Sequence, residues 1–347
     1  MSARQFSVLI AAALAPALSA LDPSLAISQY HKQYWQVEQG LPQSYVPAIL
    51  PSPESYLLVG TAEGLTQFDG LVFRPLRAEP FLQLDHRWVS SLLRTRDGAL
   101  WVGCFDGELL ELRAGKAPGR YRTGGSVFDL LEEAPGVIWA GTRNGLYRLQ
   151  GGAMSLQAGL RGPAETSWNI LARDGRGVLW VVTADGLYQR REGGFRLVMP
   201  NSSRAGQILT VRAGQGAGIW VGTSQGLYRL EGAGDLKPAA GIRGPVVSVL
   251  EDRDGVVWAA CWGRGLYRLA GGAVDEWTPS KGLPDDSIRT LVEDEEGNLW
   301  IGMRSGGLGR WRDPRIVAYG TPEGLAGDYA SIVTQGAGGT LNMNWWF

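Results

Sequence analysis

The sequence has 347 residues, a formal net charge of -1, 19% charged residues and 50 glycines. Near-neutral charge excludes a global basic field, so we expect no nucleic-acid partner and no general attraction to anionic membranes. An apolar content of 44% excludes a low-complexity disordered chain, and with so many glycines it favours short strands joined by tight turns.

The first twenty residues are interpreted as a secretory signal peptide. Arg4 supplies a positive n-region, residues 6–14 form a short apolar run, and residues 17–20 form a small-residue cleavage zone. The match is imperfect, because Leu18 occupies the minus-three position for cleavage after Ala20. The alternative is an uncleaved anchor helix, which the shortness of the run disfavours. We expect export to the periplasm or medium, with residues 21–33 as a polar lead.

One motif recurs along the rest of the chain. An acidic Gly turn leads into an apolar strand with Trp, and a few variable polar residues then precede a Gly-Leu pair and a second strand. The stretch at residues 293–311 reads EDEEGNLWIGMRSGGLGRW. The anchors are Trp101, Trp139, Trp180, Trp220, Trp258 and Trp300, with Leu58 and Asn342 in two weaker copies. Successive anchors lie 38 to 43 residues apart, which indicates an array of identical supersecondary units.

Each unit contains four short apolar segments. In the sixth unit these are residues 246–250, 257–260, 266–269 and 274–277, separated by Asp-Gly and other turn signals. We predict an all-β fold, a β-propeller of four-stranded antiparallel blades with about seven complete blades and a partial eighth. The anchor Trp is expected to fill the wedge between blades, and the Gly two residues later to lie where backbones crowd.

The two ends of the array pose the question of ring closure. Residues 34–37 resemble the tail of a repeat, so the propeller is assigned to residues 34–328, and this early strand is a candidate to close the ring. Residues 329–347 are either strays beyond a seven-bladed ring or the front of a longer, truncated array. We favour the second interpretation, because a half-blade has no mate to bury its face.

The two cysteines lie at the same slot of different repeats. Cys104 and Cys261 each follow an anchor Trp by three residues, where other repeats carry Thr. Equivalent slots of non-adjacent units lie far apart in a ring, so we expect no disulfide between them.

Catalytic patterns are weak. His31 and His86 have no partner at a metal-ligand spacing, and residues 222–226 match G-x-S-x-G only as an in-phase repeat turn. We therefore predict no catalytic residue, no metal site and no cofactor.

The variable residues between the second and third strands are the candidate site. In a propeller these turns emerge on one face around the channel mouth. The aromatic members could stack on flat ligands and the arginines could bind carboxylates; the alternative is solvated turns without a ligand. The candidates are Glu63, Phe105, Asp106, Arg143, Asn144, Asp185, Gln225, Trp262, Arg264, Arg304 and Ser305.

The consensus D-x-x-G-x-L-W-x-G-T-x-x-G-L-x-R-L resembles the two-component regulator propeller repeat over residues 34–343. The resemblance implies a periplasmic sensor of a hybrid histidine kinase or diguanylate cyclase. That family continues with further domains, a membrane helix and an output domain, none of which this sequence contains. Contact with a membrane would therefore come only through such a missing C-terminal region.

We thus expect a ligand-binding sensor propeller of a bacterial signalling system. Its ligand would be a small molecule or oligosaccharide, and its protein partner a second copy or a separate signalling chain. The alternatives are a propeller polysaccharide lyase or hydrolase, with Glu63, Asp106 and Asp185 as acid/base candidates, and a protein-interaction scaffold.

Overall fold

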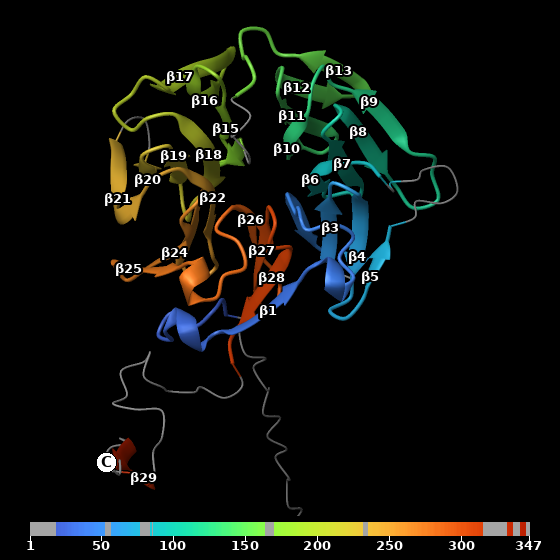
Figure 1. Ribbon diagram of the computed structural model, residues 1–347. Helices are drawn as coiled ribbons and strands as arrows, with labels where there is room; N and C mark the ends of the chain where they lie inside the picture. Colours follow the sequence, from blue (N-terminus) through green and yellow to red (C-terminus); the bar gives the residue numbers. More distant parts are fainter. Residues whose placement is uncertain are drawn as a thin grey trace, which may run out of the picture.

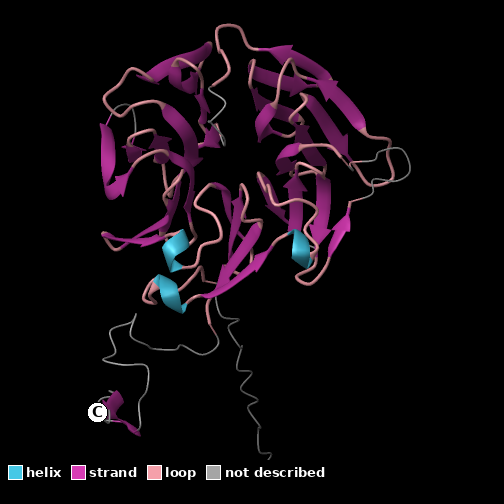
Figure 2. Cartoon of the chain, in the orientation of Figure 1, coloured by secondary structure: helices cyan, strands magenta, loops and turns pink. Residues whose placement is uncertain are grey.

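The computed structural model describes residues 19–52, 57–76, 84, 86–163, 170–231, 235–314, 332–335 and 341–344. Within these residues the chain is all β, apart from three single-turn 3-10 helices, η1 (Ile27–Gln29), η2 (Val37–Gln39) and η3 (Pro279–Lys281) (Figure 2). None of these helices has the length and apolar character needed to span a bilayer.

Seven antiparallel four-stranded sheets, the blades, account for most strands, as predicted. In chain order they are β2 (Ala48–Pro51), β3 (Leu57–Thr61), β4 (Gly64–Phe68) and β5 (Phe73–Pro75); β6 (Val89–Arg94), β7 (Leu100–Cys104), β8 (Glu108–Leu112) and β9 (Gly119–Arg122); β10 (Val127–Ala134), β11 (Val137–Thr142), β12 (Gly145–Gln150) and β13 (Ala153–Leu156); β14 (Leu171–Arg173), β15 (Leu179–Val182), β16 (Gly186–Arg191) and β17 (Gly194–Pro200); β18 (Ile208–Ala213), β19 (Ile219–Thr223), β20 (Gly226–Glu231) and β21 (Asp235–Arg243); β22 (Val246–Glu251), β23 (Val257–Cys261), β24 (Gly265–Ala270) and β25 (Ala273–Trp277); and β26 (Ile288–Glu293), β27 (Leu299–Met303), β28 (Leu308–Arg312) and β1 (His31–Trp35).

The blades form a ring (Figure 1). The first strand of each blade is innermost and contacts the first strand of the next, and β26 of the seventh blade contacts β2 of the first. The ring therefore closes at seven blades and forms the predicted β-propeller. Strands β29 (Ile332–Gln335) and β30 (Leu341–Asn344) pair with each other in a sheet of their own, where a partial eighth blade was expected.

The N-terminal strand β1 supplies the outermost strand of the last blade. Its partner is β28, with His31 opposite Arg312 and Trp35 opposite Leu308. Trp35 stacks on Trp300 with ring centroids 5.9 Å apart. Strand β1 begins three residues before the predicted strand 34–37, and Val37 lies in η2 and is half exposed. Residues 315–320, which the repeat pattern placed at the end of the seventh unit, lie outside the described residues.

Part of the segment assigned as a polar lead, residues 21–33, is buried against the ring. Leu21, Ile27 and Tyr30 are each at most 5% exposed and pack with Trp258 and Trp311 beneath the last two blades. The phenol of Tyr30 donates to the carbonyl of Asp22 at 2.8 Å. The apolar residues of this segment are spaced irregularly, so no period in the sequence reveals that they are buried.

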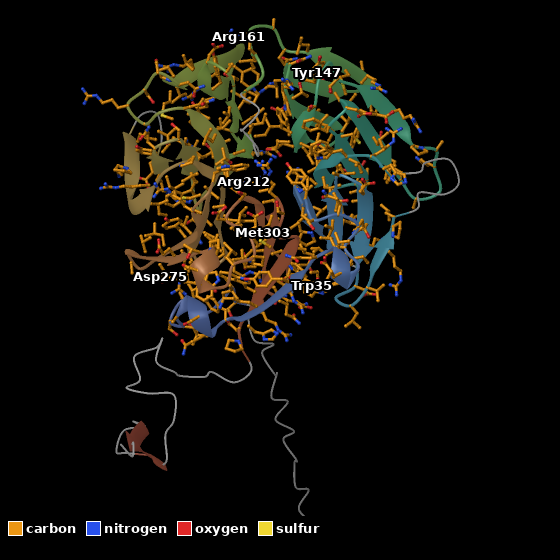
Figure 3. All side chains as sticks on the ribbon, viewed as in Figure 1. Trp35, Tyr147, Arg161, Arg212, Asp275 and Met303 are labelled. Carbon is orange, nitrogen blue, oxygen red and sulfur yellow. The ribbon has the colours of Figure 1, made fainter. Side chains whose placement is uncertain are left out.

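Side chains cover both faces of the blades (Figure 3). The anchor tryptophans pack in clusters that join neighbouring blades, as predicted. Trp139, Trp180 and Trp258 are at most 1% exposed. Trp300 of the seventh blade packs with Val46 and Phe68 of the first. Burying one such side chain removes up to about 250 Å² from water, worth several kcal/mol of gross stabilisation at about 25 cal/mol per Å².

The acidic residue that begins each turn has a second role. Asp252 Oδ1 accepts hydrogen bonds from the backbone N–H groups of Asp254 and Val256, and its Oδ2 accepts the indole N–H of Trp258 at 2.9 Å. The same indole–carboxylate bond, six residues apart, joins Trp180 to Asp174 and Trp300 to Asp294. The Asp and the Trp of the repeat are thus one hydrogen-bonded unit.

The glycine that follows the anchor Trp by two residues faces the next blade. A Cβ at Gly302 would lie 2.4 Å from the carbonyl oxygen of Val46. This close approach joins the seventh blade to the first, which explains the predicted crowding at this position. Cys104 and Cys261 are both buried and free, as expected from their equivalent slots.

Candidate functional site

The second-to-third-strand turns emerge on one side of the ring, which we call the loop face. Four of these turns share one construction, in which a buried Thr hydroxyl donates to the carbonyl of the glycine three residues later. In the fifth blade, Thr223 Oγ1 donates to Gly226 at 3.0 Å and accepts the N–H of Gln225. Ser224 in this turn accepts the N–H of Gln207, so the G-x-S-x-G match is a repeat turn.

A pocket of about 440 Å³ opens on the loop face, and we call it the loop-face pocket. Its walls come from blades seven, one, two and three, so it spans about half of the ring. The lining residues are Gln43, Tyr45, Ala62, Trp88, Phe105, Phe128, Arg143, Arg289, Arg304 and Ser305. Four of the predicted candidates, Phe105, Arg143, Arg304 and Ser305, are thus brought together in one cavity.

One wall of the loop-face pocket is aromatic. Trp88 stacks on Phe105 with ring centroids 4.1 Å apart and an interplanar angle of 12°. Tyr45 meets Trp88 edge to face at 5.6 Å. Trp88 is 38% exposed although it is large and apolar, so it offers a flat surface to a ligand.

A cationic wall adjoins the aromatic one, with the Arg289 guanidinium 5.7 Å from the ring centroid of Tyr45. Arg289 and Arg304 both lie over the ring of Trp262, at 4.0 and 5.6 Å from its centroid. Burial, with a contribution from the neighbouring Arg304, lowers the pKa of Arg289 below its usual value. An arginine stays charged at neutral pH even so. Arg143 adds a third guanidinium, and the pocket lining includes no carboxylate.

The carboxylate that acts on this wall from outside the lining is Asp285. Its attraction to Arg289 offsets part of the effect of burial. Both of its oxygens accept backbone N–H groups, Oδ1 from Ser287 at 2.9 Å and Oδ2 from Ser305 at 2.6 Å. Asp285 therefore holds the loop that carries Arg304 and Ser305, and the pocket keeps an excess of positive charge.

The remaining candidates lie on the loop face with other partners. Glu63 pairs with His86 at 2.8 Å, and Asp106 lies 3.8 Å from Arg87. Asp185 pairs with Arg161, and the amide of Asn144 donates to the carbonyl of Gly124. Gln225 and Arg264 are exposed, and Trp262 lies behind the arginine wall. These residues do not line the loop-face pocket.

The variable-turn criterion missed Arg289, Tyr45 and Trp88. Trp88 directly precedes β6, Tyr45 lies three residues before β2, and Arg289 is the second residue of β26. A charged residue at the start of an innermost strand was the available signal. The connections that lead into the first strands lie on the same loop face as the second-to-third-strand turns, so residues of both kinds of connection can line the pocket.

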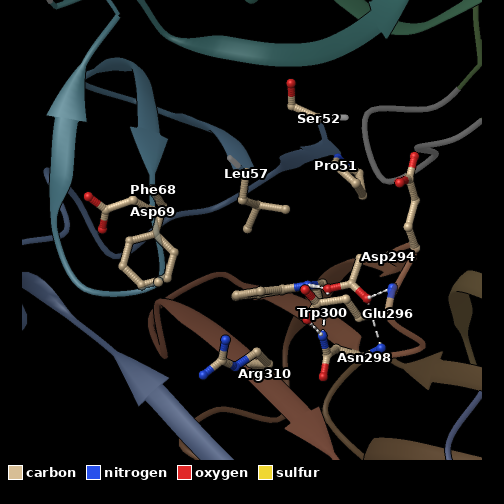
Figure 4. Close-up of a pocket in the computed structure, with 12 residues that line it drawn as sticks. Pro51, Ser52, Leu57, Phe68, Asp69, Asp294, Glu296, Asn298, Trp300 and Arg310 are labelled. Carbon is tan, nitrogen blue, oxygen red and sulfur yellow. Dashed lines mark hydrogen bonds between the residues drawn. The ribbon is translucent and has the colours of Figure 1, made fainter. Parts of the chain in front are cut away.

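A second pocket, of about 270 Å³, lies between blades seven and one, where the first-to-second-strand turns emerge (Figure 4). Two of its acidic groups are engaged in the fold. Asp294 accepts from Trp300 and Asn298, and Asp69 pairs with Arg74. We therefore assign this wedge to the architecture of the ring.

The fold is that of a seven-bladed propeller with a cationic, aromatic pocket at one end. Residues 282–305 match the family model described as two component regulator propeller, so the predicted resemblance to this repeat is confirmed. No curated protein matches the chain.

Solved structures show the same fold at low sequence identity. The extracellular domain assigned to the hybrid two component system BT3049 of B. thetaiotaomicron has a TM-score of 0.71 and 19% identity, over 90% of this chain and 46% of its own. The corresponding domain of BT4673 has a TM-score of 0.65 and 18% identity, over 81% and 39%. Streptogramin B lyase has a TM-score of 0.64 and 13% identity, over 82% and 97%. The chain thus spans less than half the length of the two extracellular domains.

Proposed function

We propose that this chain is the ligand-binding propeller of an exported bacterial signal-transduction protein, and that it binds a small anionic molecule in the loop-face pocket. The observation that carries the proposal is the convergence of Arg143, Arg289 and Arg304 in one pocket with an aromatic wall. Guanidinium groups bind carboxylates, sulfates and phosphates through paired, charge-assisted hydrogen bonds. The similarity to extracellular domains of hybrid two component systems supports a role in signalling.

The ligand should combine negative charge with a flat or apolar face. Trp88 and Phe105 offer a stacking surface, and the cavity of about 440 Å³ is within the range of small-molecule sites. Acidic sugars and aromatic acids both meet these requirements. The lining favours binding over catalysis, because its one ordinary acid/base group is the phenol of Tyr45, whose pKa burial raises further.

The test is binding of the purified chain to matched anionic and neutral compounds, namely uronic-acid oligosaccharides, aromatic carboxylates and their uncharged analogues. We expect an anionic compound to bind, and salt to weaken its binding. Arg304→Gln should weaken it at least tenfold, since a hydrogen bond to a charged group contributes about 1.5–3 kcal/mol. Arg264→Gln is the matched control, because it removes an exposed loop-face arginine outside the pocket. Equal affinities of the two variants would refute the assignment of the pocket.

Trp88→Ala separates the two ligand classes. Loss of the stacking surface should lower the affinity for aromatic acids and sugar rings but leave the affinity for simple aliphatic acids unchanged. Consumption of the bound compound during the measurement would instead favour the alternative of a propeller enzyme; streptogramin B lyase is an enzyme with a similar fold.

The partner that receives the signal is part of the proposal. A second copy of the chain or a separate signalling protein would sense the ligand through a changed arrangement of propellers. Light scattering of the purified chain with and without ligand tests the first possibility.

A further inference from the structure

The first described residues form a belt that runs under the last two blades before β1 closes the ring. Ala20 is 3% exposed, and its backbone nitrogen donates to Asp254 Oδ2 at 2.7 Å. Leu21, the next residue, is 3% exposed and packs in the cluster of Trp258 and Trp311. Ser19 is exposed. The chain thus passes from an exposed residue, Ser19, to a buried one, Ala20.

Asp254 is available to an N-terminal cation. Its neighbours in the turn are occupied, because Asp252 holds the Trp258 indole and Arg253 pairs with Glu293 at 2.5 Å. Among the described residues, no Lys, Arg or His side chain forms an ion pair with Asp254; its recorded hydrogen-bond donor is the nitrogen of Ala20.

The residues before Ala20 match the specificity of a signal peptidase. For hydrolysis of the Ser19–Ala20 bond, Ala17 occupies the minus-three position and Ser19 the minus-one position, and both are small. Cleavage after Ala20 would instead place Leu18 at minus three. It would also remove the buried Ala20 and put the new charged terminus on Leu21, which packs among tryptophans. Burying an unpaired ammonium group there would be costly.

We propose that the mature chain begins at Ala20 and that its α-ammonium group forms an ion pair with Asp254. In the processing step, water adds across the Ser19–Ala20 amide. The C–N bond breaks, the water oxygen bonds to the Ser19 carbonyl carbon to give a carboxylate, and the Ala20 nitrogen takes up protons to become the ammonium group. A signal peptidase would catalyse this step, so the proposal rests on the proposed export of the chain.

The ion pair would fasten the closing strand. The belt connects Ala20 to β1, and β1 completes the seventh blade. An internal amide offers the Asp254 carboxylate only its N–H dipole, whereas an α-ammonium group adds a full positive charge at the same short distance. Processing would therefore strengthen the closure of the ring.

The first measurement is the N-terminal sequence and intact mass of the protein recovered from the periplasm after expression of the full reading frame. We expect Ala20 as the first residue. A chain that begins at Leu21 overturns this inference but leaves the proposed export and ligand binding intact. A periplasmic chain that keeps Met1 overturns the processing step, and absence of the protein from the periplasm overturns the export as well.

The second measurement is a thermodynamic cycle on the mature chain. Asp254→Asn is made in a chain that begins at Ala20 and in one that carries a short N-terminal extension. We expect the substitution to raise the unfolding equilibrium constant about fivefold to tenfold more in the first chain than in the second. Glu295→Gln, an exposed acid in the equivalent turn of blade seven, controls for net charge and should affect both chains equally. Equal effects of Asp254→Asn in the two chains would show that no ion pair forms.

Discussion

The indole–carboxylate bond found in several repeats can be tested with a control that the chain itself provides. Trp258 donates to Asp252 Oδ2 at 2.9 Å, whereas the indole N–H of Trp101 is buried without an acceptor. Six residues before its anchor, blade two carries Thr95 at the position of Asp252, and the Thr95 hydroxyl bonds Asp97 and Ala99. The two tryptophans are otherwise alike, at 1% and 4% exposed.

Replacing each tryptophan with Phe removes a similar apolar volume, so this cost should be comparable at the two sites. Trp258→Phe also leaves Oδ2 of a buried carboxylate without its donor. A hydrogen bond to a charged group contributes about 1.5–3 kcal/mol, and this is the expected difference between the two variants. Trp101→Phe also removes a buried unpaired donor, which widens the difference.

Urea unfolding followed by circular dichroism measures both variants. With an m value of about 3 kcal/mol per M, the midpoint of Trp258→Phe should lie about 0.5–1 M below that of Trp101→Phe. If the midpoints coincide, the bond contributes nothing to stability. The conserved geometry in the blades would then reflect packing alone.

Two further predictions concern the interior. Gly302→Ala should destabilise the ring by about 1–3 kcal/mol, because the new Cβ meets the rigid carbonyl of Val46; thermal unfolding measures this, and an unchanged midpoint would show that the blades can separate slightly at no cost. Burial raises the pKa of both Cys104 and Cys261 to about 12, so neither thiol should react with iodoacetamide at pH 9 until urea unfolds the chain, as counted by mass. Because the unfolded thiols ionise from about pH 9, their contribution to stability is complete below that pH and is lost as the pH rises toward 12. Rapid labelling of the folded protein would contradict the burial.

Much of the fold follows from the repeat alone. The period of about 40 residues, the four apolar segments and the turn glycines predicted four-stranded blades, and in the sixth blade the predicted strand bounds agree with the structure within a residue. Repetition makes this possible, because every blade packs against its neighbours in the same way and so carries the same residue pattern. The Asp and the Trp belong to that pattern, but only the structure shows the hydrogen bond between them.

The sequence predicted less for structural features that occur only once in the chain. The burial of Leu21, Ile27 and Tyr30 has no counterpart in other repeats, so no periodicity reveals it. The same applies to the pocket, where Arg289 and Tyr45 join Arg304 although they lie in different turns and strands. Which of seven variable loops face one another depends on the order of blades around the ring.

The sequence by itself therefore determined the four-stranded blade and its turns, because these are local and repeated. Only the tertiary structure decided that the ring closes at seven blades, that β1 completes the seventh, that the belt before it is buried, and that three arginines from blades three and seven share one pocket with an aromatic wall. Those contacts join residues far apart in the chain, and their geometry is set by closure of the ring.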